Sequence, residues 1–129
     1  MNPIHLIGMS YRLGALPGKH GQSDCLSLAT TVLQWYGIDV PNPKRDWYRR
    51  LRNDDYSVFP EELERWGNKT DAPTIGVVAL CTAGDGYGLA VYYEEGWLSF
   101  VESVVAWSPI NALPVVGLYC RRKQISVMP

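Results

Sequence analysis

Groups that hold metals or carry redox chemistry are scarce in this 129-residue sequence, which has two histidines and three cysteines. The cysteines, Cys25, Cys81 and Cys120, are odd in number, and no two of them form a C-x-x-C pair. The two imidazoles are those of His5 and His20. We therefore expect no metal centre and no cofactor. Cys81 and Cys120 fall in apolar runs, and we interpret them as buried free thiols.

Long hydrophobic runs are also absent. No apolar segment approaches the roughly 20 residues that span a bilayer. The N-terminus lacks a basic region followed by a hydrophobic core and a cleavage site. The sequence thus predicts no membrane insertion and no signal peptide.

Neither sign of charge dominates, because 12 basic and 13 acidic residues leave a formal net charge of -1. This balance offers no electrostatic reason to expect nucleic acid or an anionic membrane as a partner. Residues 44–55 contain a basic cluster with acids interleaved, which we interpret as a solvated helix face. Its basic members are Lys44, Arg45, Arg49, Arg50 and Arg52, and its acidic members are Asp46, Asp54 and Asp55.

The composition is that of a folded globule, with 47% hydrophobic and 19% charged residues. A chain of this length can bury about two thirds of its unfolded surface. No internal repeat, low-complexity tract or linker divides it. We therefore expect a single domain over residues 1–129.

The first half of the chain has helical signals. Asn2-Pro3 suits a helix start, and apolar residues recur at helical spacing from Asp24 until Gly37. Pro60, followed by two glutamates, suits the opening of a later helix. The predicted helices cover residues 2–9, 24–36 and two segments within 44–66, and the predicted loops cover residues 14–23 and 67–70.

From Pro73 onward the signal changes to strands rich in β-branched and aromatic residues. The predicted strands cover residues 75–81, 87–94, 97–101, 104–107 and 115–121. Residues 94–96 are interpreted as a hairpin turn and residues 82–86 as a flexible connection. Helices first and an antiparallel sheet second indicate an α+β fold.

Cys25 lies at the predicted start of the helix over residues 24–36, after a good N-cap at Ser23 or Asp24. Unsatisfied amides and the helix dipole at such a position favour a thiolate over a thiol. That is the setting of a nucleophilic cysteine. The alternative is a core position, because cysteine is among the most buried residue types.

Several segments resemble an NlpC-type cell-wall peptidase domain, closest to the phage-tail and gene-transfer-agent versions. The specific segment is Asp24-Cys25 with its helix. The others are Tyr11-Arg12-Leu13-Gly14, Gly37-Ile38-Asp39-Val40-Pro41, and weaker matches at residues 75–80, 88–92, 105–109 and 116–121. The resemblance implies a papain-like α+β fold with the Cys25 helix packed on the antiparallel sheet. It also implies that Cys25 is the nucleophile, beside Asp24, and that Tyr11 helps the oxyanion site.

The histidine that the resemblance requires is missing. Tyr87 or Gly88 stands at its position, and Ser99 or Glu102 at the position of the third catalytic group. Neither tyrosine nor glycine can serve as a general base near neutral pH. His20, on the loop five residues before Cys25, is the candidate substitute.

Three further positions depart from the family pattern. The glycine two residues after the cysteine is Ser27 here, and the acid after the glycine of the first strand is Val77. The family's Trp-Gly-Gly is Leu13-Gly14-Ala15. These departures also argue against an intact active site.

Aromatic residues are abundant, with five tryptophans and eight tyrosines. Strand preference for aromatics explains about half of them. The remainder favours a binding or assembly role, because aromatics are enriched at protein interfaces and suit sugar binding. The candidate surface anchors are Trp47, Tyr48, Tyr56, Trp66, Tyr92, Tyr93 and Trp97.

The resemblance therefore implies a virion protein of a phage tail or baseplate, made in the host cytoplasm, whose partners are other tail proteins. The missing histidine favours a catalytically degenerate structural component. The alternative is an active cysteine peptidase that cleaves peptidoglycan stem peptides during host entry. A cellular amidase or toxin-like effector with an altered catalytic pair is a third reading. In each case we expect the strand over residues 87–93 to pass beside Cys25.

Overall fold

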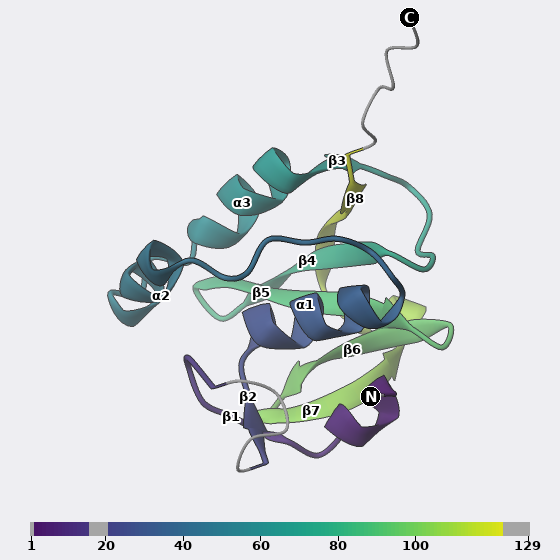
Figure 1. Cartoon of the computed structure of the whole chain (residues 1–129), viewed down its shortest axis with the longest axis horizontal. Coiled ribbons are helices and arrows are strands. Elements are labelled where there is room, and N and C mark those ends of the chain that lie inside the picture. Colours follow the sequence, from purple (N-terminus) through teal and green to yellow (C-terminus); the bar gives the residue numbers. More distant parts are fainter. Residues whose placement is uncertain (1, 16–20, 123–129) are drawn as a thin grey trace, which may run out of the picture.

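The computed structural model describes residues 2–15 and 21–122. In chain order its elements are η1 (Pro3–Leu6), β1 (Ser10–Tyr11), β2 (Gln22–Ser23), α1 (Cys25–Trp35), α2 (Arg45–Arg52), α3 (Val58–Trp66), β3 (Gly67–Lys69), β4 (Val77–Ala83), β5 (Gly86–Tyr93), β6 (Gly96–Val101), β7 (Val104–Pro109), η2 (Ile110–Ala112) and β8 (Val115–Arg121). Helices precede a mostly antiparallel sheet, so the α+β prediction is confirmed (Figure 1).

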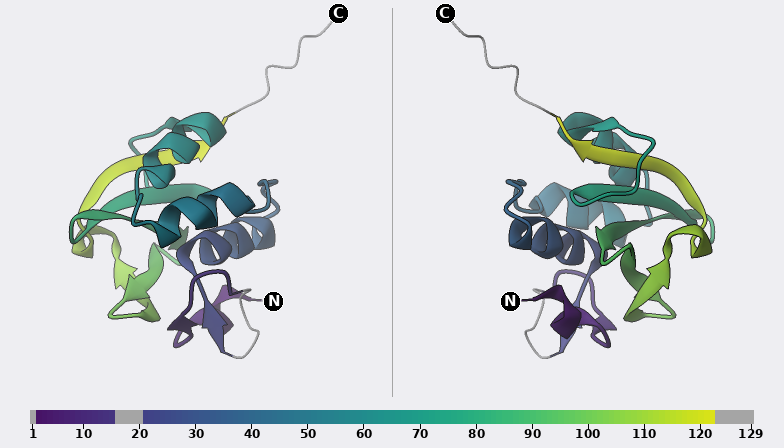
Figure 2. Two further views of the ribbon diagram at one scale, coloured as in Figure 1. Left: turned by 90° about the vertical axis from the view of Figure 1, so that its left-hand side faces the viewer. Right: turned by 90° about the vertical axis from the view of Figure 1, so that its right-hand side faces the viewer.

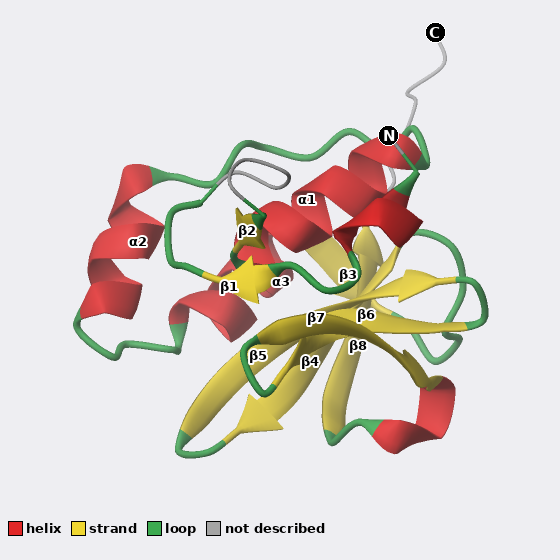
Figure 3. Cartoon of the chain, turned by 90° about the horizontal axis from the view of Figure 1, so that it is seen from below, coloured by secondary structure: helices red, strands yellow, loops and turns green. Residues whose placement is uncertain are grey.

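The strands form one sheet in the order β2-β1-β7-β6-β5-β4-β8-β3. β1 and β2 pair in parallel, and the other neighbouring strands pair antiparallel. Helices α1, α2 and α3 pack on one face of this curled sheet (Figures 2 and 3). α1 packs mainly on β5, an inner strand of the sheet (Figure 1).

Both faces of the sheet are apolar. Alternate strand residues such as Leu89 and Leu98 pack under the helices in the larger core. Ala90 and Trp97 point to the opposite face, where residues of η2 and β8 cover them. Trp97 also donates a hydrogen bond of 3.0 Å from its indole N–H to the Ile110 carbonyl. A side chain's position along a strand therefore decides which of two separate cores it joins.

Helix α1 matches its prediction to within one residue at each end. The Asp24 side chain caps it by accepting from the Ser27 N–H at 2.8 Å. At its other end Gly37 has a φ of +79°, and the Ile38 N–H reaches back to the Leu33 carbonyl at 2.9 Å. Local capping signals therefore predicted this helix correctly.

Two connections differ from their predictions. Residues 67–70, predicted as a loop that ends the preceding helix, contain β3, which pairs with β8. A Cβ at Gly67 would lie 2.1 Å from the Cys120 carbonyl oxygen, so only glycine permits this close pairing. Residues 82–86, predicted as a flexible connection, form a tight turn, since Ala83 and Gly86 are cross-strand partners.

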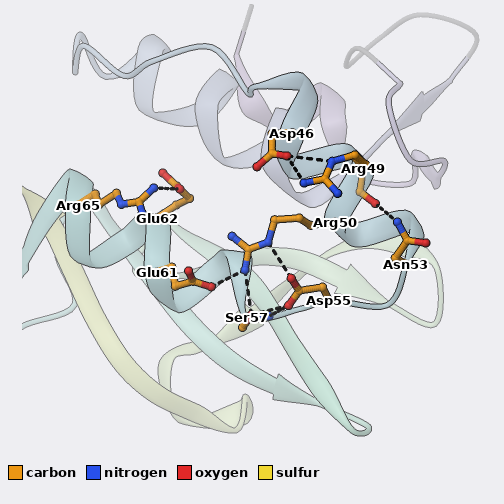
Figure 4. A network of polar contacts seen from close by, with 9 residues as sticks. All are labelled: Asp46, Arg49, Arg50, Asn53, Asp55, Ser57, Glu61, Glu62 and Arg65. Carbon is orange, nitrogen blue, oxygen red and sulfur yellow. Dashed lines mark hydrogen bonds and ion pairs between the residues drawn. The ribbon is translucent and has the colours of Figure 1, made fainter.

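The corner between α2 and α3 is held by Arg50 (Figure 4). Its guanidinium donates to Asp55 at 2.7 Å, to Ser57 at 2.9 Å, and to Glu61. Arg49 fits the predicted solvated helix face, because it is exposed and pairs with Asp46 on its own helix. Arg50 does not fit it, because its ion pairs are with Asp55 and Glu61, beyond the end of α2. One arginine of the basic cluster thus joins the two helices.

We predict that this corner loses its stabilisation in acid. Hydrogen bonds from Arg50 lower the pKa of Asp55 to about 2 and also lower the pKa of Glu61. These carboxylates remain ionised in the fold at pH values where the unfolded chain binds protons, so their contribution is complete above about pH 5 and is lost as the pH falls towards 2. The urea midpoint should therefore fall more steeply over this range in wild type than in Arg50→Gln. Arg49→Gln, one residue away, should keep the wild-type acid dependence; an Arg50→Gln profile parallel to wild type would contradict the prediction.

Gly96 provides a second prediction. A Cβ there would lie 2.4 Å from the ring of Trp107, whose indole N–H donates to the Tyr93 carbonyl at 2.8 Å. Gly96→Ala should therefore displace this ring and destabilise the fold by about 1–3 kcal/mol. Gly88→Ala is the matched control, because its nearest neighbour would be the Ala83 Cβ at an ordinary 3.8 Å. Equal urea midpoints for the two variants would refute the packing argument.

Candidate functional site

Cys25 is the first residue of α1 and is half-buried. β5 passes beside it, close enough for the backbone N–H of Leu89 to lower the pKa of its thiol. The thiol therefore lies at the contact between the start of α1 and the middle of β5.

The pairing of β5 with its neighbour explains why this amide is available. β5 pairs with β6 only over Val91–Tyr93 and Gly96–Leu98. Backbone N–H groups two residues apart on a strand point to the same edge. In a two-residue hairpin the flanking residues, here Tyr93 and Gly96, share hydrogen bonds, so the Leu89 N–H also points towards the β6 side. It has no strand partner there and meets the Cys25 sulfur instead.

Asp24 is fully buried and both of its carboxylate oxygens accept backbone hydrogen bonds. One accepts from the Ser27 N–H at 2.8 Å, and the other accepts from the Gly14 N–H at 2.7 Å. The same side chain therefore caps α1 and ties it to the segment that follows β1. These two bonds assign Asp24 an architectural role beside Cys25.

The prediction that the helix start favours a thiolate is wrong for this site. Burial raises the pKa of the Cys25 thiol to about 12, and the negative charge of Asp24 adds to the rise. Backbone N–H groups of Cys25, Leu89 and Leu26 act in the opposite direction but are outweighed. Burial away from water and the neighbouring Asp24 carboxylate both raise the thiol pKa, and together they outweigh the effect of the helix dipole.

Tyr11 lies close to Cys25, where the resemblance implied. Its ring packs edge-on against Phe100, with 5.2 Å between the ring centroids. Burial, followed by the charges of Cys25 and Asp24, raises its pKa to about 12. The hydroxyl is consequently neutral near pH 7 and can donate a hydrogen bond towards the thiol. Its help at an oxyanion site stays a prediction.

Two further tyrosines reach this site, and no spacing in the sequence identified either as a site residue. Tyr48, from α2, lies close enough to Ser27 and Asp24 for both to affect its pKa, which rises to about 12 mainly because of burial. Tyr56 packs over Gly86, where a Cβ would lie 2.5 Å from its ring, and its charge also bears on Tyr11. The general excess of aromatics was the only signal for them.

Side chains alternate along β5, so the two residues that stand at the position of the family's histidine lie on different faces of the sheet. Tyr87 alternates with Leu89 and Val91, which pack in the core under the helices, so it belongs to the face that carries α1. Gly88 belongs to the opposite face, with Ala90. Neither position supplies an imidazole.

The two positions for the third catalytic group differ in their surroundings. Ser99 alternates with Trp97 and so points to the face opposite α1; it is buried, and its hydroxyl has no hydrogen-bond partner among the described residues. Glu102 is exposed in the turn between β6 and β7, with a φ of +51°. His20 lies outside the described residues, and His5 is exposed on η1.

Comparison with known proteins does not identify this site. No family model matches the chain, and no curated protein matches it. Among residues 2–15 and 21–122, no group of three histidine, cysteine or acidic side chains could hold a metal ion. The helices of the same residues include none that is long and apolar enough to cross a membrane.

We predict that the Cys25 thiol is unusually slow to alkylate. A pKa raised from 9.0 to about 12 reduces the thiolate fraction at pH 7.5 by about 1000-fold. In a Cys81→Ala/Cys120→Ala background, iodoacetamide should therefore modify Cys25 about 1000-fold more slowly than an unstructured cysteine peptide. Asp24→Asn should speed the reaction because it removes a negative charge, whereas the exposed Asp39→Asn should not. Wild-type reaction at the rate of the peptide would contradict the prediction.

Proposed function

We propose that the chain is a catalytically degenerate, papain-like domain of the NlpC type that serves as a structural or docking component of a phage tail or baseplate. The observation that carries the proposal is the state of Cys25, whose thiol pKa is raised to about 12. The described residues place no imidazole beside it. The segments around Tyr11 and Cys25 supply the family context.

The chemistry of amide hydrolysis supports a degenerate site. A cysteine peptidase needs a thiolate, a base that generates it, and an acid that protonates the leaving amine. Tyr11 and Tyr48 have pKa values of about 12 and cannot accept a proton near neutral pH. Asp24 faces backbone amides rather than a histidine. Residues 2–15 and 21–122 thus supply groups that could orient a substrate and none near Cys25 that could accept its proton at neutral pH.

An active peptidoglycan peptidase is the second candidate. It is favoured by the position of Cys25 at a helix start, with Tyr11 and the Leu89 N–H nearby. These donors could stabilise an oxyanion. His20 would then have to act as the base from the loop before α1.

The test is release of soluble muropeptides from purified sacculi of Gram-negative and Gram-positive hosts, with lysozyme as the positive control. Wild type, Cys25→Ala and His20→Ala should all release no more than buffer, because general acid–base help worth about 10²–10⁴-fold is missing. Release that Cys25→Ala abolishes would overturn the proposal. Loss in His20→Ala as well would identify that histidine as the base.

Restoring the histidine sharpens the test. Tyr87→His places an imidazole on the face that carries α1, whereas Gly88→His places it on the opposite face. If only the base is missing, Tyr87→His should gain a low, Cys25-dependent activity and Gly88→His should gain none. Equal activity in both variants would contradict the assignment of faces.

A further inference from the structure

Two of the five tryptophans are exposed, and both lie beside Tyr93 at the end of β5. They are Trp35, the last residue of α1, and Trp107 in β7, with exposed fractions of 41% and 43%. The ring centroids of Trp35 and Tyr93 are 6.1 Å apart, and the Trp107 indole N–H donates to the Tyr93 carbonyl at 2.8 Å. Segments far apart in the sequence therefore bring both exposed indoles to the same end of the sheet.

The turn that follows Tyr93 carries two exposed glutamates, Glu94 and Glu95. Neither forms an ion pair with the part of the chain that the structure describes. Tyr36 packs edge-on against Trp35, with 4.8 Å between the ring centroids. It also lies near Glu94, because burial and then the charge of Glu94 raise its pKa. We call the surface formed by Trp35, Tyr36, Glu94, Glu95 and Trp107 the acidic aromatic surface.

The backbone of this turn does not account for its glutamates. Glu94 and Glu95 have φ values of +49° and +59°, in the left-handed region that favours asparagine and glycine. A two-residue hairpin turn with both φ angles positive is most often Asn-Gly or Asp-Gly. The two carboxylates thus stand where the fold alone favours other residues, which points to a use of their charge.

The sequence around this surface carries charge of one sign. Residues 21–43 and 70–120, which include α1 and most of the sheet, contain acidic residues but no lysine, arginine or histidine. The basic cluster belongs to α2, which lies at the other end of the long axis of the molecule from the β5–β6 turn (Figure 1). A surface of single sign attracts a partner of opposite charge.

We propose that the acidic aromatic surface docks a separate partner polypeptide through arginine side chains. A guanidinium can stack on an indole face and donate to a carboxylate at the same time, whereas the ammonium of lysine is a compact and strongly hydrated point charge. Arginine and aromatic residues are also enriched at protein interfaces. The proposal rests on the docking role given above and deepens it by naming the chemistry of the partner.

The probe for this surface is N-acetyl-diarginine amide, added to the ¹⁵N-labelled full chain. The indole signals of Trp35 and Trp107 and the amide signal of Gly96 should shift and saturate at millimolar probe, because exposed ion pairs and cation–π contacts are individually weak. N-acetyl-dicitrulline amide, which keeps the planar end group and lacks the charge, should produce no saturable shift. Signals that ignore the arginine probe, or that respond equally to both probes, would overturn the proposal.

Glu94→Gln/Glu95→Gln is the decisive variant, because it removes two charges and keeps the size of both side chains. It should weaken binding of the arginine probe by about tenfold. Asp71→Asn/Asp85→Asn is the matched control, since it removes two charges from exposed residues outside this turn. An equal loss in both variants would show that overall charge, and not this surface, attracts the probe.

Trp35 tests the aromatic part of the surface. Trp35→Leu should weaken binding of the arginine probe by about threefold, because the cation–π contact is lost. Trp35→Phe keeps an aromatic face and should lose less. Equal affinities in wild type and Trp35→Leu would refute stacking of the guanidinium on this indole.

Other partners give different results. If the same signals shift as the concentration of the chain alone rises, and Arg45→Gln/Arg52→Gln on the exposed side of α2 prevents this, a second copy occupies the surface and the assignment to a separate polypeptide is overturned. Muropeptide release by wild type would refute the degenerate function without altering the arginine result. Unresponsive indole signals would refute the acidic aromatic surface while leaving the degenerate function standing.

Discussion

The buried carboxylate of Asp24 is the constraint on which the site depends. It caps α1 and also binds the Gly14 amide, so it fixes the start of the helix against the segment after β1. The same negative charge lies beside Cys25 and helps to raise the pKa of its thiol. The group that fixes the start of α1 thus also disfavours the Cys25 thiolate, because a carboxylate bonded to backbone amides stabilises a helix and repels a thiolate at once.

The two-sided sheet is the second constraint. Both faces of β4, β5 and β6 carry core residues, so each step along the buried parts of these strands moves a side chain from one core to the other. Tyr87 and Phe100 belong to the side that carries Cys25, whereas Gly88 and Ser99 belong to the other side. The side of the sheet that faces the thiol therefore presents aromatic rings at these positions. This arrangement suits binding and packing better than proton transfer.

The aromatic residues divide into distinct roles once their surroundings are known. Trp97 and Tyr93 are core residues, and Trp107 covers Gly96. Tyr11, Tyr48 and Tyr56 gather near the thiol, and Trp66 borders a cavity. The prediction that Trp47, Tyr93 and Trp97 are surface anchors is wrong, because all three are buried, and nothing in the spacing of the aromatics separated core from surface positions.

The sequence by itself determined the α+β class, the limits of α1 and its cap, and the approximate positions of the main strands. These features follow from periodicity and capping within a few residues. The short strands β1, β2 and β3 escaped prediction because they exist only through their partners, as the close approach of Gly67 to Cys120 illustrates. Only the tertiary structure decided the state of Cys25 and the arrival of Tyr48, since burial and through-space charge depend on segments distant in sequence. Local rules therefore placed the cysteine correctly, and long-range packing decided its chemistry.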